Sequence, residues 1–313
     1  MKVITFKDIL KQNISPKMCY DWAAEMIKNK ATALLPPKIS MKPFDGVFCN
    51  VMPSIIGNTG GVKVVTRYPE RIPALESFLT IYDVETGENL ALMDATWITA
   101  MRTGAVAAHS ILLLAKKDFS TIGMVGLGNT ARAALLTLAE ICPERTFNIK
   151  LKKYDNQEID FAKRFSQYKN INFTYVDTAE QLVRGSEVII SAVTYMPEDF
   201  CDDDCYDEGV LVVPIHTLGF TNCDLFFDKV FADDYGHVCH FKNFDKFKKF
   251  AEVSDVLNGK VTGRENDKER ILAYNIGISL HDINFARHIY EALKDDPKLL
   301  EVNLDSPTEK IWI

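Results

Sequence analysis

The sequence predicts an α/β protein in which a doubly wound parallel sheet is joined to a second region of antiparallel strands. A glycine-rich turn, GLGNTA, stands between a short apolar strand and a helix within residues 121–142. Strand and helix patterns then alternate as far as residue 233, which is typical of a parallel sheet covered by helices. The stretch before residue 95 instead contains strands and a hairpin turn at residues 85–88.

Composition and charge indicate a soluble protein that does not bind nucleic acid. The 313 residues are enough for two domains, and 47% hydrophobic and 25% charged residues are ordinary values. The net charge of −7, without a long basic run, argues against a nucleic-acid partner. No signal peptide and no apolar stretch of the roughly 18 residues needed to span a membrane are recognised. Seven cysteines, an odd number, favour reduced thiols in the cytoplasm.

A lysine interrupts the apolar strand GGVKVV. Side chains alternate across a strand, so Lys63 shares its face with Val65 rather than with other charges. A buried lysine is unfavourable without a partner, and burial readily shifts its pKa. Protection of an exposed strand edge is the alternative explanation.

An arginine is similarly placed in the apolar helix predicted for residues 97–115. Apolar residues spaced by three and four form a stripe, and Arg102 lies at its margin. Asp94 and Thr96 are candidate caps of this helix. Arg102 would either extend its head into water or hold an anionic partner.

The glycine-rich turn fits the dinucleotide fingerprint GxGxxA. Gly126 permits the tight turn, Gly128 lets the backbone approach a pyrophosphate, and Ala131 permits close packing of helix on strand. Amides at the helix start, including those of Asn129 and Thr130, would bind phosphate. A purely structural turn is the alternative.

The end of the second strand bears on the choice of cofactor. Asp155 could bond a ribose hydroxyl and favours NAD, whereas Lys152 and Lys153 could meet the extra phosphate of NADP. We expect NAD, with NADP possible. Further strands are predicted at residues 147–151, 171–176, 187–194, 209–215 and 229–233, and a helix over most of residues 271–293.

Two groups of cysteine and histidine are candidate metal ligands. They are CDDDC at residues 201–205 and HVCH at residues 237–240. Neither contains the paired CxxC of a structural zinc site, so we expect no metal.

Four segments together carry a resemblance to a known family. GGVKVV, TIYDVETGENLALMDATWITAMRTGAVAA, MVGLGNTARAAL and GRENDKERILAYNIGISLHDINFARHIYEAL occur in this order. They resemble the ornithine cyclodeaminase and mu-crystallin family, which includes alanine dehydrogenases and ketimine reductases. The similarity covers about residues 36–293.

The resemblance implies roles for Lys63 and Arg102, the two basic residues in apolar surroundings. In this family the arginine that matches Arg102 and the lysine that matches Lys63 bind the substrate carboxylate, and Lys63 would also pass a proton to or from the substrate nitrogen. Lys38 in PPKIS matches a third basic residue, usually arginine. We expect Glu76 beside the substrate, and Thr103 and Thr194 beside the cofactor.

One position departs from the cyclodeaminase pattern. In the cyclodeaminases an aspartate after the fifth strand meets the substrate amine, and His216 stands there in this sequence. Histidine cannot anchor a cationic amine as a carboxylate does, but it can act as an acid or base. His216 as an ordinary loop residue is the alternative. Asp224 lies farther along and matches an acidic residue of the family's next helix.

The resemblance also implies the domain organisation. Residues 1–115 and 285–313 are expected to form a discontinuous α+β domain for substrate binding and homodimerisation, and residues 116–284 the Rossmann-type NAD(P)-binding domain. Asp282 matches a family aspartate near the junction, a helix-surface carboxylate being the alternative.

Three functions follow as hypotheses. The first is an NAD(P)-dependent oxidoreductase that transfers hydride at the α-carbon of a small α-amino or α-imino acid. The second is an ornithine cyclodeaminase with catalytic NAD, which His216 disfavours. The third is a binder of NAD(P) and a carboxylated ligand without turnover.

Overall fold

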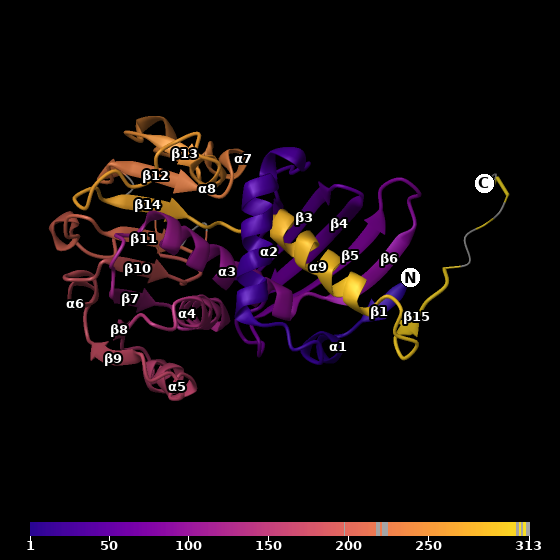
Figure 1. Cartoon of the computed structure of the whole chain (residues 1–313), viewed down its shortest axis with the longest axis horizontal. Helices are drawn as coiled ribbons and strands as arrows, with labels where there is room; N and C mark the ends of the chain where they lie inside the picture. Colours follow the sequence, from indigo (N-terminus) through magenta and orange to yellow (C-terminus); the bar gives the residue numbers. More distant parts are fainter. Residues whose placement is uncertain (197, 217–219, 221–224, 305–306, 308, 311–313) are drawn as a thin grey trace.

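The computed structural model describes residues 1–196, 198–216, 220, 225–304, 307 and 309–310. Its strands form two sheets that lie side by side, with helix α2 (Pro16–Asn29) between them (Figure 1). Asp224 lies outside the described residues. The predicted α/β fold is confirmed.

The first sheet is mostly antiparallel and has the strand order β15-β1-β6-β5-β4-β3-β2. Only β1 and β6 pair in parallel within it. Its strands are β1 (Lys2–Ile4), β2 (Ile39–Met41), β3 (Phe48–Ile56), β4 (Thr59–Arg67), β5 (Leu75–Asp83), β6 (Asn89–Asp94) and β15 (Leu300–Glu301). Helix α9 (Ser279–Leu293) crosses one face of the sheet, and the short helix α1 (Phe6–Leu10) follows β1 (Figure 1).

The second sheet is parallel throughout, with the order β13-β12-β14-β11-β10-β7-β8-β9. The order reverses between β7 and β10, so the sheet is doubly wound. Its strands are β7 (Thr121–Val125), β8 (Phe147–Lys152), β9 (Ile171–Val176), β10 (Val188–Ser191), β11 (Leu211–Pro214), β12 (Lys229–Ala232), β13 (Phe250–Glu252) and β14 (Ile271–Tyr274). Its helices are α4 (Asn129–Ile141), α5 (Gln157–Arg164), α6 (Ala179–Val183), α7 (Tyr235–Val238) and α8 (Val253–Leu257).

Helix α3 (Thr96–Leu114) connects the two sheets and packs on α2 and α4. Contrary to the sequence expectation, it is long and apolar enough to cross a membrane by length and composition. However, 78% of the apolar window is buried inside the protein, as in the core helix of a soluble fold. Ala95, not a capping side chain, precedes the helix, while Asp94 accepts the backbone N–H of Thr96 at 2.9 Å.

The prediction of a helix from residue 271 was wrong for its first part. Residues Ile271–Tyr274 form β14, a fully buried strand in the middle of the parallel sheet. A short run of apolar residues suits a buried strand or a buried helix equally well, so periodicity alone could not separate them. The chain passes from the second sheet to the first at residues 275–278, and the expected boundary at residue 284 lies within α9.

Candidate active site

Three charged side chains from separate elements meet at the junction of the two sheets. Asp282 on α9 lies with Oδ2 2.7 Å from Lys63 Nζ and with Oδ1 2.8 Å from Arg102 Nε. Lys63 and Asp282 are fully buried, and Arg102 is 6% exposed. These values exclude a snorkelling Arg102 and a surface Asp282. Lys63 lies on β4, which has β3 and β5 as neighbours, so edge protection is excluded too.

The cluster carries one negative and two positive charges in a dry environment. Burial opposes ionisation of Asp282, but Arg102 and Lys63 outweigh it and hold the pKa of this carboxyl below its usual range. Burial and the neighbouring Arg102 lower the pKa of Lys63 to about 7, although Asp282 acts in the opposite direction. Lys63 can therefore gain or lose a proton near neutral pH.

Arg102 uses only one edge of its guanidinium for Asp282. Its terminal nitrogens Nη1 and Nη2 make no hydrogen bond within the described part of the chain. These nitrogens lie beside Gly277, where an added Cβ would come within 2.7 Å of Nη1. The planar end of the guanidinium is thus positioned to bind a second, external carboxylate.

Lys38 reaches the same region from the segment before β2. Its Nζ donates to the carbonyl of Ile276 at 2.9 Å, in the crossing between the sheets. Burial, with Arg102 as a further cause, lowers the pKa of Lys38 to about 8. The three cations proposed from the sequence therefore surround residues 276–282.

His216 follows the carboxyl end of β11, where the charges of Lys38 and Arg102 act on it. Burial, and then the charges of Lys38 and Arg102, lower the pKa of His216 to about 4. The imidazole is neutral at physiological pH. It therefore offers no negative charge to a substrate ammonium.

The glycine-rich turn has the geometry required for a dinucleotide. Gly126 has φ +77°, and a Cβ there would lie 2.5 Å from the Ala192 backbone. At Gly128 an added Cβ would meet nothing within 4 Å, so the backbone is open to a ligand. Gly128 is also the N-cap of α4, and no side chain caps this helix. The amides of Asn129, Thr130 and Ala131 at its start fit a pyrophosphate.

The cofactor turn and the charged cluster lie on the same edge of the parallel sheet. The turn follows β7, Thr194 follows β10, His216 follows β11, and residues 275–278 follow β14. The carboxyl ends of parallel strands share one edge, and ligands of such sheets bind at this edge. Thr194 is exposed there.

Two further residues predicted to bind the cofactor, Asp155 and Thr103, lie in a turn and in a helix interior. Asp155 is exposed in the turn after β8 with φ +49°. Lys153 beside it pairs with Asp177 at 2.9 Å. Thr103 is buried in α3, where its hydroxyl donates to the Thr99 carbonyl at 2.6 Å.

Glu76 does not join the cluster. Lys63 is paired with Leu79 on β5, so Glu76 points to the opposite face of the sheet. Its carboxylate is exposed and pairs with Arg71 at 2.8 Å. It borders a separate cavity of about 730 Å³ whose lining contains none of Lys38, Lys63 and Arg102.

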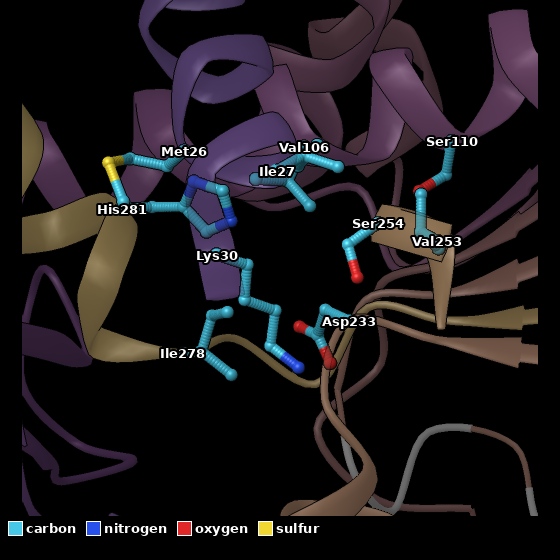
Figure 2. Close-up of a pocket in the computed structure, with 10 residues that line it drawn as sticks. All are labelled: Met26, Ile27, Lys30, Val106, Ser110, Asp233, Val253, Ser254, Ile278 and His281. Carbon is cyan, nitrogen blue, oxygen red and sulfur yellow. The ribbon is translucent and has the colours of Figure 1, made fainter. Parts of the chain in front are cut away.

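Sequence reasoning missed the buried Asp233, at the end of β12. Its Oδ2 accepts the backbone N–H of Gly277 at 2.9 Å and so shapes the loop against Arg102. Burial raises its pKa. Figure 2 shows Asp233, Lys30 and His281 around a cavity of about 10 Å³, room for about one water molecule. The sequence signal was a carboxylate directly after an apolar strand.

Fold and site define a protein of the dinucleotide-binding class, with a buried cluster of charged side chains near the edge that carries the binding turn. The sequence profile of the ornithine cyclodeaminase/mu-crystallin family matches residues 3–296. The chain therefore belongs to this family, as the sequence motifs predict.

Individual relatives are distant but align over most of their length. An alanine dehydrogenase from Archaeoglobus fulgidus is 27% identical over 281 residues, which cover 83% of this chain and 84% of that protein. A Delta(1)-pyrroline-2-carboxylate reductase from Bacillus thuringiensis is 27% identical over 270 residues, which cover 77% and 80%. The solved structure of the Thermococcus litoralis Delta(1)-pyrroline-2-carboxylate reductase, in complex with NADH and L-proline, superimposes with a TM-score of 0.84. It is 23% identical and covers 96% of this chain and 100% of that one.

Proposed function

We propose that this protein is an NAD(P)-dependent oxidoreductase that transfers hydride at the α-carbon of a small α-imino or α-amino acid, with a cyclic ketimine carboxylate as the preferred substrate. The observation that carries the proposal is the free end of Arg102 in a buried cluster with Lys63 and Asp282. A buried guanidinium with unused donors is a specific receptor for a carboxylate.

The substrate carboxylate binds to Arg102 Nη1 and Nη2, with Lys38 as a second positive charge. Asp282 holds Nε of the same guanidinium at 2.8 Å and thereby fixes its plane. The orientation of the substrate is set by this plane before any chemistry occurs.

Lys63 supplies the proton. With a pKa of about 7, its ammonium form protonates the imine nitrogen, and its amine form accepts the proton in the reverse direction. Thr99 Oγ1 lies 3.5 Å from Nζ and helps to orient it. The turn of Gly126 and Gly128 would hold a nicotinamide dinucleotide, which would supply or accept the hydride. NAD is the expected cofactor because the exposed Asp155 can bond a ribose hydroxyl, and NADP is possible because Lys152 and Lys153 precede Asp155.

The electrostatics at His216 favour a substrate without a second amine. A diamino acid such as ornithine would place an ammonium near a neutral imidazole that Lys38 and Arg102 surround. This disfavours ornithine cyclodeamination. The names of the relatives include reductases and dehydrogenases of small imino and amino acids, and also an ornithine cyclodeaminase.

A second copy of the chain is the proposed partner. The sheet face opposite α9 carries an apolar row that crosses four strands, and its outer members Ile39 and Phe78 are 61% and 53% exposed. The row consists of Ile39, Val51, Val64 and Phe78. An exposed apolar patch of this kind is typical of an interface. Light scattering should find a dimer that Phe78→Glu dissociates and Tyr175→Glu, on the second sheet, does not.

The six described cysteines are free, in keeping with the proposed cytoplasmic location.

The direct test of function is isotope transfer. NADH deuterated at the transferable C4 position and Δ1-pyrroline-2-carboxylate should give proline with deuterium at the α-carbon. Proline that forms without deuterium, or no proline with either deuterated NADH or deuterated NADPH, contradicts the proposal. A parallel titration with ornithine and norleucine, the isostere with a methyl group in place of the δ-ammonium, should show tighter binding of norleucine, a preference that His216→Asp reverses.

A further inference from the structure

The segment that carries Lys38 is anchored on the nucleotide-binding sheet by His237. The backbone N–H of Lys38 lies 3.2 Å from His237 Nε2, and the two residues come from opposite sides of the junction. His237 is buried. It is the first histidine of HVCH, a motif for which no metal role was expected and which the proposed chemistry does not use.

The contacts of the imidazole determine where its proton lies. A backbone N–H can only donate, so Nε2 must be the unprotonated acceptor. Nδ1 then carries the proton and donates it to Asp234 Oδ2, which lies 2.6 Å away. Asp234 is itself fixed, since Oδ2 also accepts the His237 N–H at 3.1 Å and Oδ1 pairs with Lys30 at 2.7 Å.

The anchored segment is short and stiff. Lys30 also pairs with Glu252 at 2.5 Å, so residues 30 and 38 are both bound to the nucleotide-binding sheet. Pro36 and Pro37 precede Lys38, fix two φ angles and have no N–H. Lys38 therefore provides the first N–H after the prolines, and the bond to His237 sets the direction in which its side chain leaves the backbone.

We propose that His237 is a positioning residue for substrate binding. By accepting the Lys38 N–H, it directs the Lys38 side chain toward the crossing at Ile276 and hence toward the substrate carboxylate. Asp234 and Lys30 hold the imidazole in the required tautomer and orientation. This inference rests on the proposed function of Lys38.

Three single variants separate positioning from general stability. His237→Leu removes the acceptor, His237→Gln returns an oxygen near the place of Nε2, and His240→Leu changes the exposed histidine of the same motif. His237→Leu should raise KM for Δ1-pyrroline-2-carboxylate about tenfold while kcat stays within about twofold. His237→Gln should recover most of this loss, and His240→Leu should match the wild type.

A double-mutant cycle tests whether His237 acts through Lys38. In a Lys38→Met background, His237→Leu should have no further effect on KM. The Kd of NADH should stay within about twofold in all variants. An unchanged KM in His237→Leu, or an equal loss in the Lys38→Met background, overturns the inference. A parallel loss of NADH affinity would indicate general disruption and overturns it as well.

Two measurements on the wild type complete the test. Nitrogen-15 NMR of labelled protein should show His237 protonated on Nδ1, and a proton on Nε2 overturns the inference even if every variant misfolds. Binding of pyrrole-2-carboxylate, a planar carboxylate that cannot be reduced, tests the proposed function separately. A wild type that neither binds this probe nor turns over imines refutes the function and the inference, whereas an active wild type with KM insensitive to His237 refutes the inference alone.

Discussion

Lys63 Nζ and Asp282 Oδ2 lie 2.7 Å apart and are both fully buried, which ties β4 near the start of the chain to α9 near its end. A buried ion pair is not by itself a large source of stability, because desolvation offsets the Coulomb attraction. Its effect here is to hold a lysine of lowered pKa and the edge of Arg102 in fixed positions at the proposed substrate site.

Removing the charge of Asp282 should destabilise the protein. Asp282→Asn leaves Lys63 and Arg102 without their counter-charge, and the free energy of unfolding should fall by about 3–5 kcal/mol. Denaturant titration measures this change. Asp177→Asn, which breaks an exposed pair with Lys153, is the control and should leave stability unchanged. Equal effects of the two substitutions would contradict the central role of Asp282.

The pH dependence of imine reduction should report Lys63. Its pKa of about 7 means that the ammonium form prevails below this pH and is lost above it. kcat/KM for reduction should therefore be level at lower pH and fall as the pH rises through about 7, while amino-acid oxidation should rise over the same range. Lys63→Arg, which stays charged, should not show this fall in kcat/KM above about pH 7, and Lys38→Arg should still show it. A fall in kcat/KM that persists in Lys63→Arg would assign the titration to another group.

Gly277 should be required for the position of Arg102. Gly277 and Gly87 have φ values of +77° and +75°, so alanine should cost about 1–2 kcal/mol of backbone strain at either position. A Cβ at Gly277 also comes within 2.7 Å of Arg102 Nη1, whereas at Gly87 it meets nothing within 4 Å. The guanidinium end can shift, so Gly277→Ala should fold and lose at least about tenfold in kcat/KM. Gly87→Ala, the strain-matched control, should keep full activity, and equal kinetics of the two variants would argue against a substrate site at Arg102.

Gly128 should affect the cofactor without affecting the fold. An added Cβ there meets nothing within 4 Å, and the φ of −79° suits any residue. Gly128→Ala should therefore have the same melting temperature as the wild type. It should bind NADH at least about tenfold more weakly, because the added methyl group occupies the space of the pyrophosphate. Gly126→Ala should lose stability as well, since its Cβ would clash with the backbone of Ala192. Wild-type NADH affinity in Gly128→Ala would place the dinucleotide elsewhere.

Within the candidate site, the sequence indicated the residues that conflict with their local pattern, and the structure shows that these residues are buried and paired. Lys63 in an apolar strand and Arg102 beside an apolar stripe were recognisable as charges that need partners. Their shared partner was not, because Asp282 reaches them through tertiary contacts that no local spacing encodes. Asp282 was equally consistent with a helix surface before its burial was known.

The sequence-based predictions failed where the answer depends on tertiary contacts or on strand register. β14 was assigned to a helix because four buried residues are too few to define a period. Glu76 was placed beside the substrate although strand alternation relative to Lys63 sends it to the other face, and that relation depends on the register of β4 with β5. The role of His237 was not predicted, because its contact with Lys38 joins two segments that are distant in the sequence.

The most direct test of the account is the oxidation of NADH and NADPH by cyclic ketimine carboxylates, followed by absorbance for the wild type, Arg102→Met and the surface control Arg184→Met. The account predicts turnover by the wild type and by Arg184→Met, and a loss of at least about a hundredfold in kcat/KM for Arg102→Met, equivalent to about 3 kcal/mol of transition-state binding. Absence of turnover by the wild type, or full activity of Arg102→Met, would contradict it.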